Sequence, residues 1–581
     1  MSQATSPSET SAASQEASNP GSRAPDTAVL DRAVTAVAES KQRWARLGLK
    51  ERRRLLDRTA REFLAVAPRW AEAGLAAKGL TEGGPAGGEE WLTGPYLVVR
   101  NLRLLHDALE DIAEAGKPEI PGPVKTRPDG RVTAGVFPSS LYDRMFYPNV
   151  TAEVWMQPGV ALTDLPSTQA VAYDDPPPEG RSVLVLGAGN VSSIGPMDAL
   201  YKLFVEKKTV VVKAHPVNAF LGPLFEEGFA SLIAEGFLRI VYGGAEEGDY
   251  LCRHPEIDEI HITGSDRTYD AIVFGPGADG QAAKAENRPR NQKTITAELG
   301  NVSPVIVVPG PWKDGDFSYQ AQNLAAMLVN NAGFNCNATR VIVLPASWPG
   351  SDRLLDELRR TLERISTRQA YYPGARDRFA AFQEAHPEME TFGQPAEGEL
   401  PWALVPDVDP RESDDICFRQ EAFCGLFAAT RLAGDDLEDY LERATEFCNQ
   451  ALWGSLNATL IVHPAARRKA AVEEAISNLR YGTVAVNHWA AVGYGLVVTT
   501  WGAFPGHPAQ DIQSGNGVVH NTLMFSRAEK SVVRAPFRAM PKPPWFPGHR
   551  TDAELAEALT RFEAAPSPFR LPGIFWEALR G

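Results

Sequence analysis

Ser182-Val-Leu-Val-Leu-Gly-Ala-Gly-Asn190 decides how this chain folds, because a short apolar run ends there in a glycine-rich turn that a helical pattern follows. The preceding stretch, Asp174-Asp-Pro-Pro-Pro-Glu-Gly180, cannot pair in a sheet, since proline lacks the backbone donor and fixes its own φ. Further buried strands are expected at Thr209-Val-Val-Val-Lys213 and at 257–262, with a helix near 225–235 between them. Strands that alternate with helices at this spacing predict a parallel α/β sheet.

The alternation of strands and helices continues toward the C-terminus, whereas the N-terminal part of the chain has helical patterns only. Strands are expected at 303–308, 341–344 and 483–487, and helices near 320–330, 352–365 and 465–479. Upstream, amphipathic patterns predict helices at 28–47, at 50–65 and from about 67 onward. Residues 1–27 are rich in Ser, Ala, Thr, Glu and Pro, which predicts a disordered tail.

The composition excludes several classes of protein. The 581 residues are 44% hydrophobic and 23% charged, which suits an ordinary globular protein of more than one domain. A net charge of −15 without any Lys/Arg stripe disfavours a nucleic-acid partner, and no apolar stretch reaches the ~18 residues of a membrane span. The five cysteines show no metal-ligand or redox-pair spacing, so we predict no metal and an intracellular, cytoplasmic location.

One cysteine lies where a nucleophile could act. Cys336 ends the polar turn Asn331-Ala-Gly-Phe-Asn-Cys336, between an apolar helical run and the β-like residues 340–344. A single cysteine needs a partner base to become a candidate nucleophile. The alternative is that Cys336 is inert, because cysteine is among the most buried residue types.

The remaining signals are each weak. Gly187-Ala-Gly189 lacks the third glycine of the dinucleotide fingerprint, whereas Gly243–Gly248 and Thr263-Gly-Ser265 could bring backbone N–H groups to a phosphate or simply make turns. Lys213 ends a strand at the edge of the sheet where ligands usually bind, and could equally be a surface lysine. Glu298 lies between apolar stretches, where burial could raise its pKa toward that of a useful base, although most such carboxylates are only salt-bridged.

Taken together, these signals occur in a specific order. The motifs are Asn190 followed by Lys213, Gly244-x-x-x-Gly248, Ile262-Thr-Gly-Ser265, Glu298-Leu-Gly-Asn-Val-Ser-Pro304, Asn331 to Arg340, and Gln420-Glu-Ala-Phe423. In this order and at these distances the chain resembles the aldehyde dehydrogenase superfamily from about residue 28 to about residue 535.

The resemblance implies a fold: an α/β protein with a Rossmann-like cofactor domain, an α/β catalytic domain and a small β extension that joins subunits into a homodimer or homotetramer. On this chain the parts would be a cofactor domain at 28–138 and 180–297, an oligomerisation extension at 139–179 and 518–540, a catalytic domain at 298–517 and a C-terminal addition at 541–581.

The resemblance also implies roles for residues. Cys336 would attack the aldehyde carbon, the Asn190 amide would stabilise the oxyanion, and Glu298 would activate water to hydrolyse the thioester. Lys213 and Glu421 would hold the ribose hydroxyls of the cofactor and Phe423 would pack near its nicotinamide ribose, with Gly244, Gly248 and Ser265 completing the cofactor site. The product would be a carboxylic acid.

Two features distinguish this chain from the family pattern near the cysteine. Phe334 replaces the usual glutamine, and Arg340 lies one residue closer to Cys336 than expected. A Gly-, Pro- and charge-rich insertion at about 274–291 predicts a surface excursion beside the cofactor. The aromatic residues of 488–494 and 501–506 favour an apolar or aromatic aldehyde, with ordinary core packing as the alternative.

The sequence leaves an alternative for the cofactor and two alternatives for the reaction type. Pro216 stands where NAD-preferring members often carry a glutamate, so nothing there repels a 2′-phosphate; we expect NADP to be preferred, with NAD as the alternative. The presence of Glu298 favours hydrolysis. The alternatives are a CoA-acylating aldehyde dehydrogenase and a non-catalytic member that keeps the fold as a binding or scaffold module.

Overall fold

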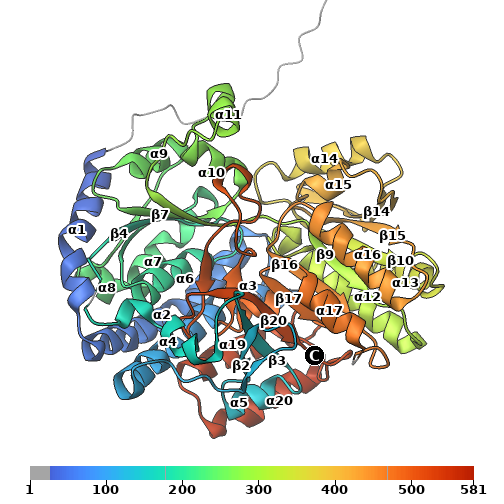
Figure 1. Ribbon diagram of the computed structural model, residues 1–581, viewed down its shortest axis with the longest axis horizontal. Coiled ribbons are helices and arrows are strands. Elements are labelled where there is room, and N and C mark those ends of the chain that lie inside the picture. The colour runs from blue at the N-terminus through green and yellow to red at the C-terminus, as the bar shows by residue number, and fades with distance from the viewer. Residues whose placement is uncertain (1–26, 85, 177, 468) are drawn as a thin grey trace, which may run out of the picture.

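The computed structural model describes residues 27–84, 86–176, 178–467 and 469–581. Within these ranges the chain forms two α/β lobes, each built on its own large sheet, with antiparallel strands and the C-terminal helices below and between them (Figure 1). Of the tail predicted at 1–27, residues 1–26 lie outside the described residues. Helix α1 begins at Thr27. No helix in the described part of the chain is both long enough and apolar enough to cross a membrane.

The first lobe is built on a parallel sheet with the strand order β6-β5-β4-β7-β8. Its strands are β4 (Ser182–Leu186), β5 (Thr209–Lys213), β6 (Leu238–Val241), β7 (Glu259–Gly264) and β8 (Thr294–Leu299). Helices cover both faces, which explains why these strands read as continuous apolar runs rather than alternating ones. The first two predicted strands are confirmed, the third begins two residues later than predicted, and the sequence patterns did not indicate β6 or β8.

The helices of this lobe include one that differs from the prediction. They are α1 (Thr27–Arg46), α2 (Leu49–Ala77), α3 (Glu89–Thr93), α4 (Pro95–Ala115), α6 (Ile194–Leu200), α7 (Gly222–Gly228), α8 (Ala230–Ala234), α9 (Ala245–Arg253), α10 (Asp266–Val273) and α11 (Gly277–Ala285). The helices predicted at 50–65 and from 67 are one helix, α2, which continues through Pro68. Burial of Phe63 and Trp70 on either side of Pro68 stabilises the helix enough to offset the missing hydrogen bond.

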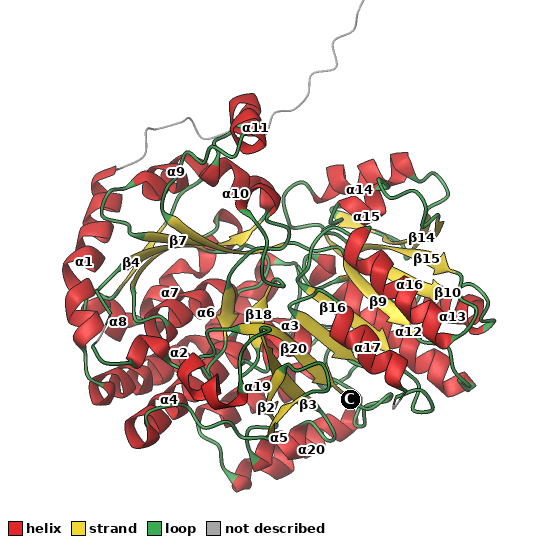
Figure 2. Ribbon diagram, viewed as in Figure 1, coloured by secondary structure: helices red, strands yellow, loops and turns green. Residues whose placement is uncertain are grey.

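The second lobe is built on a sheet that, within the described residues, has eleven strands (Figure 2). The run β20-β17-β16-β9-β10-β15-β14 is parallel, and antiparallel strands flank it. The parallel strands are β20 (Ala528–Arg534), β17 (Thr483–Val486), β16 (Asn457–Ile461), β9 (Ser303–Val307), β10 (Thr339–Pro345), β15 (Leu426–Leu432) and β14 (Trp402–Val408). The covering helices are α12 (Asp314–Val329), α13 (Gly350–Leu362), α14 (Ala375–Ala385), α15 (Ile416–Arg419), α16 (Leu437–Gln450) and α17 (Ala470–Asn478).

An antiparallel extension continues the second sheet in the same chain. It contains β1 (Val124–Thr126), β2 (Val132–Phe137) and β3 (Thr151–Met156), and β3 pairs with β20. Strands β3 and β20 fall inside the ranges expected for the oligomerisation extension, and β2 lies just before them. The role of these strands in joining subunits stays a prediction.

The C-terminal addition is part of the core rather than a tail. Its helices α19 (Asp552–Ala564) and α20 (Leu571–Arg580) pack near α4 and α5 (Leu141–Phe146) at the lower edge of the molecule (Figure 1). Leu555, Phe562 and Ile574 are buried in the same core as α2 and α4.

Candidate active site

The predicted site residues of the first lobe meet at one edge of its sheet. Lys213 is the last residue of β5, Glu298 lies near the end of β8, and Asn190 and Ser265 follow β4 and β7. Because all five strands are parallel, their carboxyl ends share an edge, which is where open α/β sheets bind ligands. The cysteine loop of the second lobe lies against this edge.

The loop that carries Cys336 has an unusual backbone. Between α12 and β10, Asn331, Ala332 and Gly333 adopt left-handed conformations with φ of 52°, 54° and 81°. A Cβ on Gly333 would lie 2.4 Å from the carbonyl oxygen of Cys424, so only glycine fits there. The buried Arg340 side chain donates from Nη2 to the Gly333 carbonyl and from Nη1 to the Cys424 carbonyl, each at 2.7 Å, and thereby fixes the loop.

Cys336 and Asn190 line one cavity of about 210 Å³. The Asn190 side chain donates from Nδ2 to the Phe334 carbonyl at 2.9 Å, which orients the amide beside the cysteine. The Glu298 carboxylate lies close enough to the Cys336 thiol to shift its pKa, and it accepts a hydrogen bond from Trp501 Nε1 at 3.1 Å. The structure therefore brings the three predicted catalytic residues together. It also adds Trp501, which the sequence suggested only as a tunnel aromatic.

Burial is the main cause of the pKa shifts of Glu298 and Cys336. Burial raises the pKa of Glu298 to about 8, although the hydrogen bonds from Trp501 and Cys336 act to lower it. Burial, together with the carboxylates of Glu298 and Glu421, raises the pKa of the Cys336 thiol well above its usual range. The resting cysteine is therefore a thiol, and the nearby carboxylate is a base whose pKa lies close to neutral pH.

Sequence reasoning missed a buried polar network behind the cysteine loop. Lys78, just after α2, forms a buried ion pair with Glu90 and donates to Asn331 Oδ1 at 2.8 Å and to the Asn190 carbonyl at 3.3 Å. Tyr371 donates to the same Asn190 carbonyl at 3.1 Å. No motif marks Lys78, because it ends a helix far from the cysteine in sequence and reaches the site only through the fold.

Replacing Lys78 with methionine is expected to destabilise the protein and to lower its activity. The change would leave the buried Glu90 carboxylate unpaired, which costs about 3–5 kcal/mol of unfolding free energy. Urea unfolding and steady-state turnover measure both effects, and Lys50→Met, at an exposed position of α2, is the matched control. An unfolding midpoint for Lys78→Met equal to that of the control would contradict the prediction.

On the cofactor side of the site, two glycines lie against neighbouring side chains. A Cβ on Gly248 would lie 3.7 Å from Lys213 Cδ and Cε, and one on Gly189 would lie 2.2 Å from His215 Nδ1. Burial lowers the pKa of Lys213, while the Glu247 carboxylate acts to raise it. Lys213 and Gly248 thus lie side by side, and their binding of a cofactor stays a prediction.

Two predicted phosphate contacts begin helices. Gly244 caps α9, and its backbone N–H donates to the Glu247 carboxylate at 2.6 Å. Ser265 is exposed and caps α10, where its Oγ accepts from the Thr268 N–H at 3.2 Å. Helix N-termini are suited to binding a phosphate, although the Glu247 carboxylate already accepts from the N–H of Gly244.

Glu421 provides a test of whether a dinucleotide fits. The Oε1 atom of its carboxylate is buried with no hydrogen-bond partner among the described residues. Burial raises the pKa of Glu421 to about 7, against the effect of Arg340. A Cβ on Gly300 would lie 2.1 Å from Glu421 Oε2, so glycine there admits the carboxylate. An orphaned acceptor of this kind fits a ribose hydroxyl.

Phe423 lies in an aromatic cluster beside this carboxylate. Its ring centroid is 4.9 Å from that of Tyr372 and 5.9 Å from that of Phe334. Its backbone is left-handed at φ 42°, and Arg378 donates to its carbonyl at 3.2 Å. Phe334, where the family pattern has glutamine, is therefore buried against aromatic rings and contributes its carbonyl rather than a side-chain amide.

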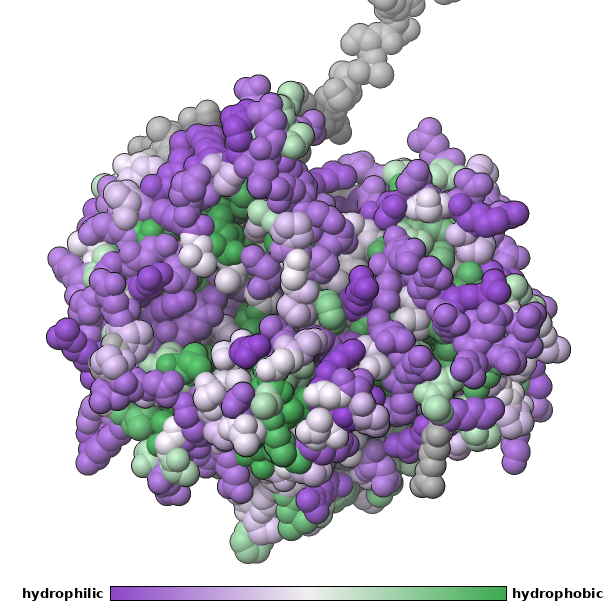
Figure 3. All heavy atoms as spheres, viewed as in Figure 1, coloured by the Kyte–Doolittle hydropathy of each residue, from purple (hydrophilic) through white to green (hydrophobic). Residues whose placement is uncertain are grey.

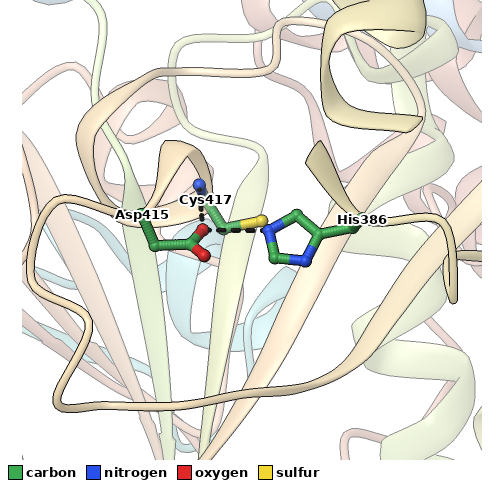
Figure 4. A group of neighbouring side chains, drawn as sticks. All are labelled: His386, Asp415 and Cys417. Carbon is green, nitrogen blue, oxygen red and sulfur yellow. Dashed lines mark hydrogen bonds and ion pairs between the residues drawn. The ribbon is translucent and has the colours of Figure 1, made fainter. Parts of the chain in front are cut away.

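A His/Asp/Cys group lies in the second lobe, although the sequence predicts no metal. Potential ligand atoms of His386, Asp415 and Cys417 lie within 4.8 Å of one another (Figure 4). His386 Nε2 already faces Asp415 Oδ1 at 3.1 Å and Nδ1 faces Glu388 at 2.9 Å, while Asp415 Oδ1 also accepts from the Cys417 N–H at 2.8 Å. Burial acts to lower the pKa of His386, but the two carboxylates raise it overall. These contacts tie α14 to α15.

Comparisons with known proteins agree with this architecture. The family model described as "Aldehyde dehydrogenase family" matches residues 183–375. The chain is 27% identical over 169 residues to 4-trimethylaminobutyraldehyde dehydrogenase A of Danio rerio, covering 29% of this chain and 30% of that protein. It is 34% identical over 146 residues to 1-pyrroline-5-carboxylate dehydrogenase 2 of Bacillus subtilis (strain 168), covering 24% and 26%. These alignments span less than a third of either relative.

Solved structures match over far more of the chain. An NAD-dependent aldehyde dehydrogenase from Sinorhizobium meliloti superimposes with a TM-score of 0.59 at 16% identity, covering 89% of this chain and 88% of that one. An NADP-dependent glyceraldehyde-3-phosphate dehydrogenase from Bacillus halodurans C-125, complexed with NADP, gives 0.58 at 18% identity, covering 87% and 91%. At such identity these matches establish the fold alone.

Fold and site together define a two-lobed α/β protein with a Rossmann-like sheet facing a cysteine loop. The aldehyde dehydrogenase family model matches the segment that holds both Asn190 and Cys336, and the fold of the whole chain is similar to that of the aldehyde dehydrogenases with which it superimposes.

Proposed function

We propose that this protein oxidises an aldehyde to a carboxylic acid with NAD(P)⁺, through a thiohemiacetal and then a thioester on Cys336. The observation that carries the proposal is that Cys336 lies beside the Glu298 carboxylate and lines a cavity that Asn190 also lines. A nucleophile, a base and an oxyanion donor in contact are what acyl chemistry of this kind requires.

The first half of the reaction uses all three residues. Glu298, as a carboxylate, takes the thiol proton, and the Cys336 sulfur adds to the aldehyde carbon. One N–H of the Asn190 amide is committed to the Phe334 carbonyl, and the other is free to donate to the oxyanion that forms on the former aldehyde oxygen. A buried donor of this kind contributes about 3–4 kcal/mol to transition-state stabilisation.

The second half releases the acid. NAD(P)⁺, when bound, supplies the acceptor for the hydride that leaves the former aldehyde carbon, so that a thioester remains on Cys336. After losing its proton to solvent, Glu298 takes a proton from water, whose oxygen adds to the thioester carbon and displaces the sulfur. The thiol is regenerated, and aldehyde, water and NAD(P)⁺ have become carboxylic acid, NAD(P)H and a proton.

Lys213 and Glu421 would hold the cofactor through its ribose hydroxyls, and Lys213 could pair with a 2′-phosphate. We propose NADP as the preferred cofactor and NAD as the alternative, because Pro216 places no carboxylate against the 2′-phosphate. Glu247 opposes this preference, because its negative charge, in the first turn of α9, lies near Lys213 and would repel a 2′-phosphate bound there.

Replacing Glu247 with glutamine is expected to raise the ratio of kcat/KM with NADP to kcat/KM with NAD by roughly fivefold, about 1 kcal/mol, because one negative charge near Lys213 is removed. Glutamine can keep the hydrogen bond with the Gly244 N–H. Steady-state kinetics with both cofactors measure the ratio, and Glu246→Gln, on the same helix turn but exposed, is the control. An unchanged ratio would show that Glu247 does not face the bound 2′-phosphate.

The test of the proposed function is reduced-nicotinamide formation with NADP and NAD separately, across short aliphatic, long aliphatic and aromatic aldehydes, with and without CoA. Turnover without CoA that is lost on alkylation of the thiol would support hydrolytic oxidation. Acyl-CoA as the product would instead favour the acylating alternative. Cofactor binding without turnover would favour the non-catalytic one.

A further inference from the structure

The C-terminal addition lines the same cavity as the nucleophile. Besides Cys336 and Asn190, the cavity is lined by Leu555 and Leu559 of α19 and by Ile574, Phe575 and Ala578 of α20. The segment that precedes these helices contributes Met540 to Trp545. Residues that no sequence motif explained therefore form the wall opposite the catalytic loop.

Apart from Thr93, His488 and Lys542, the wall between the catalytic loop and these helices is apolar or aromatic. Its middle part comes from Leu97 of α4, Phe146 of α5, Val492 and Leu496. Tyr96 and Tyr147 also line it, but their hydroxyl groups face each other at 3.1 Å and so satisfy one another. Such a lining offers burial to hydrocarbon and few hydrogen bonds to a polar substrate.

The wall is anchored rigidly. The buried Arg100 of α4 donates from Nη1 to Glu563 of α19 at 2.5 Å and from Nη2 to Asp143 of α5 at 3.1 Å. The Gly88 N–H donates to Asp552 at the start of α19 at 2.9 Å. The Phe146 ring lies 5.0 Å from that of Phe562 and 6.1 Å from that of Phe575. Helix α19 is thus held to α4 by a buried ion pair and packs against α5, and α20 packs against α5.

The cavity also has an apolar opening. Met145 of α5 and Met540 both line it, yet their side chains are 37% and 75% exposed. Hydrophobic residues are visible at the lower edge of the molecule, where α5 and α20 lie (Figure 3). A chain that fills the cavity would therefore meet apolar surface all the way to the opening.

Resting on the proposed function, we propose that residues 541–581 are the specificity wall of the aldehyde site and select aldehydes with a long apolar chain. A volume of about 210 Å³ has room for on the order of ten water-sized groups, and a methylene group is of comparable bulk. Each methylene that the wall buries contributes about fourfold to kcat/KM. The enzyme thus discriminates among aldehydes by the length of the chain that the wall buries, as well as by the carbonyl group.

The test uses the full chain and compares two substitutions on neighbouring positions of α20. Ala578→Trp places a large ring into the cavity, whereas Leu579→Trp places the same ring at a position that is 75% exposed and does not line the cavity. The readout is the ratio of kcat/KM for dodecanal to kcat/KM for propanal. We expect wild type and Leu579→Trp to share a ratio well above ten, and Ala578→Trp to lower it at least tenfold.

A binding measurement tests the specificity wall independently of catalysis. In the Cys336→Ala background, isothermal titration should show dodecanoate binding more tightly than butanoate, with the difference reduced by Ala578→Trp and not by Leu579→Trp. If Ala578→Trp fails to fold, Ile574→Ala, which enlarges the cavity, should instead shift the preferred chain to a longer aldehyde.

The outcomes are distinguishable. Absence of turnover with every aldehyde would overturn the proposed function, whereas the binding difference could still hold. Turnover with propanal and dodecanal at equal kcat/KM, or a ratio that Ala578→Trp and Ile574→Ala both leave unchanged, would overturn the specificity wall and leave the proposed function standing.

Discussion

Replacing Cys336 with alanine is expected to lower turnover by about 10⁴-fold or more, because no other cysteine among the described residues lines the cavity to form the thioester. Cofactor binding should stay nearly intact, since Lys213 and Glu421 lie on other elements. Steady-state turnover and titration with NADP or NAD measure the two effects.

The control for this substitution is Cys448→Ala. Cys448 is buried in α16 of the second lobe, and the contact that Tyr481 makes with it goes to the backbone carbonyl, which alanine keeps. This variant should retain the activity of wild type. A Cys336→Ala protein that still oxidises aldehydes would contradict the mechanism as a whole.

Replacing Glu298 with glutamine is expected to slow thioester hydrolysis by about 10²–10⁴-fold, because the base that activates water is lost. Hydride transfer should slow by less, although Glu298 also takes the thiol proton, because a thiol is a far stronger acid than water and depends less on a neighbouring base. Rapid-mixing experiments should show a burst of reduced nicotinamide close to one per site, followed by a slow steady state. Glu438→Gln, at an exposed position of α16, is the control. Equal slowing of burst and steady state would argue against the assigned role.

The pH dependence tests the same residue. Glu298 works as a base only when ionised, and burial raises its pKa to about 8. The hydrolytic rate should therefore rise with pH, reach half its maximum near pH 8, and flatten above it. In Glu298→Gln this limb should disappear. A wild-type rate that is flat between pH 6 and pH 9, or a limb that survives in Glu298→Gln, would assign the titration to another group.

The prediction from sequence was most accurate where the signal is local. The strands at 182–186 and 209–213 were predicted correctly because a run of β-branched residues buried on both faces has few alternatives. The continuous helix through Pro68 was missed, since the loss of one hydrogen bond is visible in the sequence but the burial of Phe63 and Trp70 is not. Strand β8 was missed because its first residues are not fully buried and include polar side chains, so the sequence there has no continuous apolar run.

The sequence by itself determined the parallel α/β architecture and the order of the motifs around Asn190, Glu298 and Cys336, because spacing along the chain specifies which strand ends share an edge. Only the tertiary structure decided which distant groups complete the site. Lys78 contacts Asn331, Trp501 contacts Glu298, and the helices of residues 541–581 line the cavity of Cys336, all from remote parts of the chain. Contacts of this kind depend on packing in three dimensions, and packing leaves no periodic trace in a single sequence.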